Sequence, residues 1–177
     1  GDLVSRSVSV ADWYLSHRLL GTEYSPNAIA LVEESARLCD GLEDALPGRD
    51  RIVVASLMSA LLISGEAMTR AGSSAPASGA EHLISHYLDM TRSLTDAGDL
   101  HGCQVGVATI TTAAFYEQLL ATNLDRELDT SGLIASHRSW AELHKELHEH
   151  FGGLATALLP QARHKRLSPA QLTQRLT

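Results

Sequence analysis

The chain has 177 residues, of which 44% are hydrophobic, and this length and composition predict one domain with one sizeable core. A formal net charge of -7 and the lack of a dense run of Lys and Arg argue against a nucleic-acid footprint and against a basic membrane-surface patch. Two cysteines are too few for a disulfide framework and no signal sequence or long uncharged apolar stretch is present, so we expect a cytoplasmic chain without membrane insertion.

Apolar residues recur every three or four positions, and the alternating pattern of a half-buried strand is missing over any useful length, which predicts an all-α helical bundle. A first helix is expected over residues 3–20, ending near Gly21. A second helix is expected after Ser25, which can cap it, and Pro26, which fits its first position. A third and strongly apolar helix, from 52 to about 70, is expected to be central.

A loop of small residues at 72–77 separates the third helix from a fourth, which Ser78 can cap and which is expected to reach about residue 95. A short turn at 96–99 follows. A fifth helix is then expected over 102–124.

The last part of the chain is more polar. A helix is expected over 136–159, interrupted or softened at Gly152 and Gly153. Ser168 and Pro169 then predict a short terminal helix with serine as its cap.

Histidines are the residues best suited to chemistry. His144 and His148 lie four apart on one helix face, but Glu and Lys neighbours indicate a solvated surface. His82 and His86 have the same spacing and follow the small-residue loop, and His101 follows a turn that returns the chain. Two imidazoles and a carboxylate would bind Zn²⁺, Fe²⁺ or Ni²⁺ and leave positions open for water or substrate. Capping or core histidines around a turn remain the alternative.

Several stretches resemble one enzyme family, the sn-glycerol-1-phosphate dehydrogenases. These stretches are Pro76 to His82 followed by His86, Leu100 to Gly102 followed by residues 105–108, and Gly1 to Ser5 followed by Asp12 and Trp13. The family belongs to the wider group of iron-containing alcohol dehydrogenases, glycerol dehydrogenases and dehydroquinate synthases. Members share an N-terminal nucleotide-binding α/β domain and a helical metal-binding domain, and the likeness spans roughly residues 1–120.

The resemblance implies that Asp2, His82 and His101 bind a divalent metal ion, with Zn²⁺ preferred and Fe²⁺ or Ni²⁺ as alternatives. It also implies that His86 faces the substrate and positions it or relays a proton. NAD(P) would be held mainly by the other domain, whose glycine-rich segment is not found in these 177 residues. Gly1 in place of Met likewise leads us to expect a piece of a longer polypeptide.

Residues 1–177 are therefore expected to form the helical metal-binding catalytic domain of an NAD(P)-dependent polyol phosphate dehydrogenase. Its partners would be an N-terminal nucleotide-binding domain or subunit and a small phosphorylated polyol or ketone, and the resemblance also allows a homo-oligomer. The expected reaction reduces dihydroxyacetone phosphate to sn-glycerol 1-phosphate, and we expect the chain alone not to turn over. The alternatives are a dehydroquinate synthase-like lyase domain and a catalytically silent helical interaction module.

Ser78 and Glu81 are also expected near the metal, where they would contact its ligands or the substrate. Ser78 could instead be a helix cap, and Glu81 could instead be a first-turn carboxylate that favours the helix dipole. Ala75 stands where family members often have Arg, which removes a natural partner for a substrate phosphate and leaves the substrate's identity open.

Overall fold

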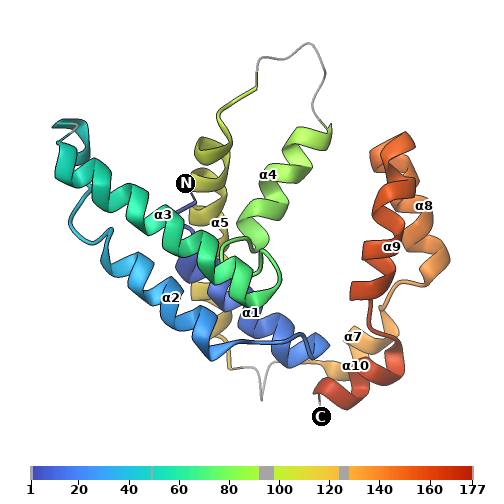
Figure 1. The fold of residues 1–177 in the computed structure, drawn as a ribbon. Coiled ribbons are helices and arrows are strands. Elements are labelled where there is room, and N and C mark those ends of the chain that lie inside the picture. The colour runs from blue at the N-terminus through green and yellow to red at the C-terminus, as the bar shows by residue number, and fades with distance from the viewer. Residues whose placement is uncertain (1, 49, 92–97, 124–127, 177) are drawn as a thin grey trace. The chain divides into compact units, whose positions relative to one another are not determined.

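The computed structural model confirms the all-α class, because the residues it describes form helices, turns and loops without a strand (Figure 1). The described residues are 2–48, 50–91, 98–123 and 128–176. The chain divides into two compact units. The first unit consists of Gly1–Tyr87 and Ala97–Tyr116, and the second of Leu88–Asp96 and Glu117–Thr177.

The first two helices follow the local signals in the sequence. Helix α1 spans Arg6–Leu20 and ends at Gly21, whose φ of 73° is left-handed and whose N–H donates to the His17 carbonyl. Helix α2 spans Pro26–Arg37, and the Ser25 hydroxyl accepts from its first turn. The end of α1 and the start of α2 are thus confirmed. The expected start of the first helix at residue 3 is wrong, because residues 2–5 form turns.

Helix α3 spans Arg51–Ala71, after a short 3-10 helix η1 at Leu46–Gly48. It packs mainly on α2, and its buried residues are Ala60, Ser64 and Ala67, which lie on one face. Small side chains on this face allow a close approach of the two backbones. The Ser35 hydroxyl of α2 donates to the carbonyl of Ala60.

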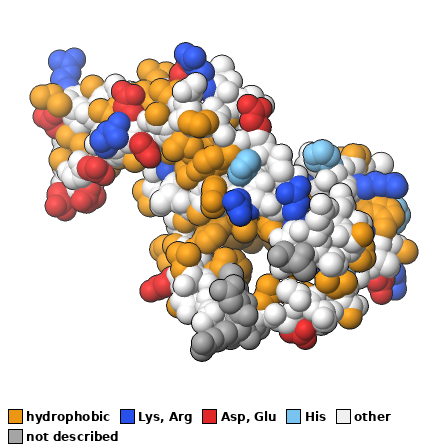
Figure 2. Space-filling view, turned by 90° about the horizontal axis from the view of Figure 1, so that it is seen from below, with side chains coloured by type: hydrophobic (Ala, Val, Ile, Leu, Met, Phe, Trp, Pro, Cys, Tyr) orange, Lys and Arg blue, Asp and Glu red, His pale blue; other side chains and the backbone are white. Residues whose placement is uncertain are grey.

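The expectation that this third helix is central is wrong, because most of α3 is not buried in the first unit. Only the narrow small-residue face is buried, whereas Ile52 and Leu62 are 78% and 71% exposed. Hydrophobic side chains also lie on the surface drawn in Figure 2. Among the described residues, α3 is the one helix whose length and composition would allow it to cross a membrane, which revises the expectation that the chain lacks a long apolar stretch.

Helices α4, Ala80–Thr91, and α5, His101–Ala121, begin in the first unit and carry the predicted histidines (Figure 1). Helix α5 starts one residue earlier than predicted. The predicted end of the fourth helix near residue 95 lies outside the described residues. The predicted end of the fifth helix near 124 is wrong, because α5 ends three residues earlier, at Ala121. Val105 and Ala108 of α5 are buried in the core of this unit.

Beyond α5, the described residues of the second unit form four α-helices and a short 3-10 helix. They are α7 at Thr130–Ala135, α8 at Trp140–Phe151, η2 at Gly152–Leu154, α9 at Ala155–Lys165 and α10 at Pro169–Leu176. The predicted interruption at Gly152 is confirmed, because its φ of 52° is left-handed and ends α8. The predicted start at residue 136 is wrong, because α7 ends there and Ser139 caps a new helix. The last helix follows Ser168 and Pro169 as predicted.

Candidate metal centre

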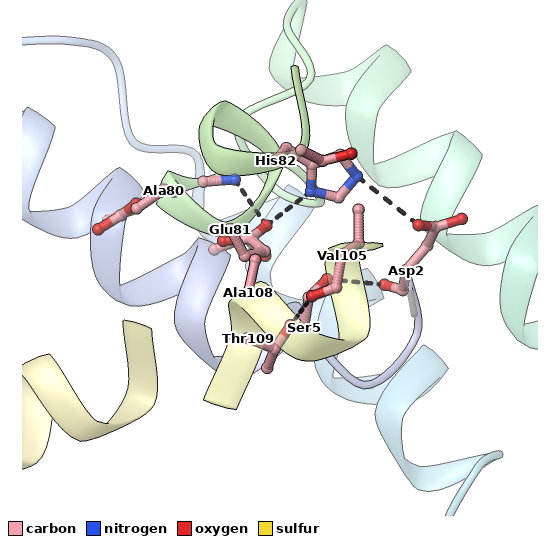
Figure 3. A network of polar contacts seen from close by, with 12 residues as sticks. Asp2, Ser5, Ala80, Glu81, His82, Val105, Ala108 and Thr109 are labelled. Carbon is pink, nitrogen blue, oxygen red and sulfur yellow. Dashed lines mark hydrogen bonds and ion pairs between the residues drawn. The ribbon is translucent and has the colours of Figure 1, made fainter. Parts of the chain in front are cut away.

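Three side chains from three segments of the first unit meet at one point, and Figure 3 labels two of them, Asp2 and His82. Asp2 lies in the turn before α1, His82 in the first turn of α4, and His101 at the first position of α5. The Asp2 Oδ1 atom lies 3.7 Å from His82 Nε2 and 3.8 Å from His101 Nε2. All three donor atoms lie within 4.8 Å of one another. The structure thus brings together the three residues predicted as metal ligands.

The separations of these atoms fit a shared cation better than direct bonds. They exceed hydrogen-bond length. Donors that share one Zn²⁺ at about 2.0–2.2 Å stand about 3.3–3.6 Å apart in tetrahedral geometry, close to the separations found here. The Asp2 Oδ1 atom is buried and has no hydrogen-bond partner among the described residues. A cation between it and the two imidazoles would compensate that buried oxygen, so the residues present fit the ion.

The turn that carries Asp2 and the loop before α4 are both tied to the start of α1. The Ser5 hydroxyl donates to the Asp2 carbonyl over 3.1 Å, as drawn in Figure 3. The Ser9 hydroxyl donates to the Pro76 carbonyl over 3.3 Å. Both serines are fully buried, so these bonds join the turn and the loop to α1 away from water.

Gly79 is required by this close packing. A Cβ atom at this position would stand 2.9 Å from the Ser9 Cα and 2.8 Å from carboxylate oxygens of both Asp12 and Glu81. A side chain at 79 would therefore push α4 away from α1. Glycine lets the first turn of α4, with His82, reach the site.

Each of the two histidines has a buried polar group on the side of its ring away from Asp2. Glu81 Oε1 lies 2.7 Å from His82 Nδ1, and the glutamate is fully buried. Ser85 Oγ lies 3.2 Å from His101 Nδ1 and donates to Gln104 Oε1 over 2.7 Å. Glu81 and Ser85 are four residues apart and occupy the same face of α4.

Asp12 links α1 to α4 and α5. One of its oxygens accepts from the Ala80 N–H and the other from the Tyr116 hydroxyl. Burial, together with the hydrogen bond to Asp12, raises the pKa of Tyr116 above its usual value, so its hydroxyl stays a neutral donor. Asp12 and Tyr116 thereby hold the helices that carry His82 and His101.

His86 and Ser78 lie near the three ligand residues. The His86 side chain is exposed, and its ring is stacked 6.0 Å from the His101 ring, centroid to centroid. Ser78 is half-buried in the loop. The N–H groups at the start of α4 bond to Glu81 and Asp12, so these two carboxylates cap the helix.

Sequence reasoning missed Ser85, Gln104 and Tyr116. Helical spacing could have indicated the first two, because Ser85 is one turn after Glu81 and Gln104 one turn after His101. Tyr116 lies four turns along α5 from the site, and no local signal joins it to Asp12.

The second histidine pair lies elsewhere. The rings of His144 and His148 are 4.7 Å apart on α8, in the second unit. Among the residues that the structure describes, Asp2, His82 and His101 form the one group of three or more His, Cys, Asp or Glu donors close enough to share an ion.

Comparison with known proteins supports the resemblance to one family. No family model matches the chain. A curated protein of Haloquadratum walsbyi, named glycerol-1-phosphate dehydrogenase (NAD(P)+), is 49% identical over 112 residues, which are 63% of this chain and 31% of that protein. Proteins of the same name from Natronomonas pharaonis and Thermococcus kodakarensis are 49% and 44% identical over 119 and 113 residues.

The chain spans about a third of the length of these relatives, since the match covers 31% of each of the three. The matched part is the C-terminal part of those proteins. The chain is thus similar to the C-terminal part of glycerol-1-phosphate dehydrogenases, as its motifs predicted.

Proposed function

We propose that the chain is the metal-binding half of an NAD(P)-dependent polyol phosphate dehydrogenase that reduces dihydroxyacetone phosphate to sn-glycerol 1-phosphate. One observation carries the proposal: a buried Asp2 oxygen, which has no hydrogen-bond partner in the described part of the chain, faces the Nε2 atoms of His82 and His101. The similarity to glycerol-1-phosphate dehydrogenases over 63% of the chain supports the reaction. Two nitrogen donors and one oxygen donor suit Zn²⁺ first, with Fe²⁺ or Ni²⁺ as alternatives.

The residues of this chain would hold the ion and leave it accessible. Three protein donors leave at least one coordination position open, which is the arrangement of catalytic rather than structural sites. A bound divalent ion supplies Lewis-acid polarisation of a carbonyl oxygen. Asp2 and His101 have side chains that are 49% and 45% exposed, so a small ketone can approach this side of the site.

His86 is proposed to hold and transfer the proton that a reduced carbonyl oxygen needs. Its imidazole is exposed and lies beside the rings of both histidine ligands, with a centroid separation of 6.3 Å from His82. An imidazole can donate and accept a proton at a ring nitrogen, so the position suits a relay.

Binding of the substrate is proposed to involve Ser78, and binding of NAD(P) is proposed to involve another domain or subunit. The half-buried Ser78 lies in the loop before His82, where its hydroxyl can contact substrate. Ala75 offers no charge to a phosphate, so the substrate phosphate must be bound elsewhere. NAD(P) is proposed to bind mainly to an N-terminal nucleotide-binding domain or subunit. A cytoplasmic location and the absence of membrane insertion remain predictions.

The test uses the complete polypeptide that carries this chain. We expect oxidation of NADH or NADPH with dihydroxyacetone phosphate, loss of that activity on chelation, and its return on adding Zn²⁺, Fe²⁺ or Ni²⁺. His101→Ala should reduce turnover to background, and His148→Ala, which removes a surface histidine of α8, should not. Release of inorganic phosphate from a dehydroquinate-synthase substrate, without change in the nicotinamide, would indicate the lyase instead. Binding of the metal without either reaction would indicate a silent module.

A further inference from the structure

Both histidines of the proposed metal site contact one face of α4 through the nitrogen that points away from Asp2. The contact of His82 is Glu81, and that of His101 is Ser85. Glu81 and Ser85 are both fully buried and lie one turn apart. A single helix thus supports two ligands that come from two different helices.

The Glu81 contact favours one of the two tautomers of the His82 ring. Glu81 Oε1 accepts the Gly79 N–H over 2.8 Å, and a glutamate carboxylate has acceptor oxygens only. The His82 Nδ1 atom at 2.7 Å must then donate, which places the proton on Nδ1 and leaves the lone pair on Nε2. In Figure 3, the His82 ring lies between Glu81 on one side and Asp2 on the other.

The Ser85 contact does the same for His101. The Ser85 hydroxyl has one proton and gives it to Gln104 Oε1 over 2.7 Å. Its oxygen can therefore only accept from His101 Nδ1, at 3.2 Å. The proton again lies on Nδ1, and the Nε2 lone pair faces Asp2.

Stability alone does not account for a carboxylate at position 81. Its second oxygen, Oε2, is buried without a hydrogen-bond partner among the described residues. A buried carboxylate with one unpaired oxygen costs free energy. An exposed first-turn carboxylate would interact with the helix dipole without that cost.

We propose that Glu81 and Ser85 are positioning residues that fix His82 and His101 as Nδ1–H tautomers, with both Nε2 atoms directed at the site. Each residue acts on its own histidine. This proposal rests on the proposed metal site. It adds the identity of the residues that orient the two histidine ligands before an ion binds. Partners of this kind typically change metal affinity by about 10–100-fold when removed.

The decisive measurement is made on the metal-free chain. Two-bond proton–nitrogen spectra of the imidazole rings report which nitrogen of each histidine carries the proton. We expect Nδ1–H at both His82 and His101. An Nε2–H tautomer at either one overturns the proposal for that ligand, whatever the behaviour of any variant.

Two variants test whether each support acts separately. Glu81→Ala should disturb the tautomer of His82 and leave that of His101 as Nδ1–H, and Ser85→Ala should do the reverse. Ser64→Ala, which removes a buried hydroxyl from α3, is the matched control and should disturb neither. A purely structural role would lower the melting temperature without this crossed pattern, and that outcome overturns the proposal.

Metal affinity supplies the second readout, with Co²⁺ or Zn²⁺ alone as the probe. Glu81→Ala and Ser85→Ala should each weaken binding by about 10–100-fold. Glu81→Gln keeps an acceptor oxygen for His82 and Gly79, so it should recover most of the loss. An unchanged dissociation constant in Glu81→Ala and Ser85→Ala contradicts the proposal.

The two proposals can fail separately. A wild-type chain that binds no metal defeats the proposed function, whereas the tautomers remain readable without metal. If Glu81→Ala does not fold, the wild-type tautomers, Ser85→Ala and Glu81→Gln still decide the matter.

Discussion

Two pairs of histidines in this chain share the same helical spacing and have different surroundings. His82 and His86 lie on α4, and His144 and His148 lie on α8. The ring centroids are 6.3 Å apart in the first pair and 4.7 Å in the second. By ring separation alone, the second pair would be the better candidate for binding a metal.

The carboxylates near the two pairs differ in what they already bind. On α8, Glu146 forms an ion pair with Arg138, and Glu149 lies 3.6 Å from Lys145. These exposed ion pairs contribute little stability, but they give both carboxylates a cationic partner on or near the same helix. Near His82, the Asp2 Oδ1 atom has no hydrogen-bond partner among the described residues.

The difference shows that the spacing of histidines does not by itself make a metal site. In the first pair, His82 is part of the proposed site because a second helix adds His101, a distant turn adds Asp2, and buried groups contact the rings of both ligand histidines on the side away from Asp2. The second pair sits on one helix beside the Trp140 ring, at 6.3 Å from His144. Long-range packing, rather than local pattern, distinguishes the two.

Removing a histidine from each pair should give the largest contrast. We expect His82→Ala to abolish measurable Zn²⁺ or Co²⁺ binding, because the variant lacks one of the proposed ligands. This loss exceeds the change in metal affinity of about 10–100-fold that is expected when a residue that orients a ligand is removed. His148→Ala should leave the dissociation constant unchanged. Isothermal titration calorimetry of the chain measures both. Equal losses in the two variants would mean that the ion binds at α8 as well.

Glycines in the two units offer the next contrast. Gly79→Ala would place a Cβ 2.9 Å from the Ser9 Cα, so α1 and α4 must shift, and we expect a loss of about 1–3 kcal/mol in unfolding free energy. Urea denaturation followed by circular dichroism measures this loss. The same variant should weaken metal binding, because His82 moves with α4.

Gly153→Ala is the matched control for that substitution. A Cβ at Gly153, in η2, meets nothing within 4 Å, so the expected change is within about 0.5 kcal/mol. A Gly79→Ala chain that is as stable as Gly153→Ala would show that the contact between α1 and α4 is loose.

The parts of the fold that sequence predicts are those governed by neighbours along the chain. Gly21 ends α1 and Ser25 with Pro26 begins α2, because left-handed backbone and side-chain caps are local properties. The exposure of α3 could not be predicted, since its apolar residues resemble those of a core helix and only packing on α2 selects the small-residue face. Whether the two compact units form one domain stays a prediction.

The site divides in the same way. The spacing of His82 and His101 around a turn indicated a metal, but Asp2 entered only through family resemblance, because nothing local brings a residue at the start of α1 beside the start of α5. The buried position of Glu81 was also not predictable. A glutamate in the first turn of a helix is ordinarily exposed, and only the close approach at Gly79 encloses it.

Tyr116→Phe tests the hydrogen bond that the Tyr116 hydroxyl of α5 donates to Asp12 of α1. The loss of the hydrogen bond to Asp12 should cost about 1.5 kcal/mol of unfolding free energy at neutral pH, measured by urea denaturation. Tyr14→Phe, an exposed tyrosine of α1, is the control and should cost nothing measurable.

The same variant has a pH signature. Burial first, and then the bond to Asp12, raises the pKa of Tyr116 above its ordinary value of 10.0. Its contribution to stability is fully present below pH 10 and is lost as pH rises toward the higher folded value, because the unfolded chain releases that proton first. The unfolding free energy of the wild type should therefore fall more steeply above about pH 10 than that of Tyr116→Phe. Parallel curves would show that Tyr116 is not held by Asp12.

Ser139→Ala should have the smallest effect and should be confined to the second unit. The Ser139 hydroxyl accepts the Glu142 N–H, and the Glu142 carboxylate accepts the Ser139 N–H, so the two residues form a capping box at the start of α8. Loss of this cap should cost about 1 kcal/mol of helix stability. Hydrogen exchange of the α8 amides measures that cost, and the dissociation constant for Zn²⁺ should stay unchanged, because the cap lies outside the unit that contains Asp2, His82 and His101. A weakened metal affinity in Ser139→Ala would contradict this expectation and show that the two units are energetically coupled.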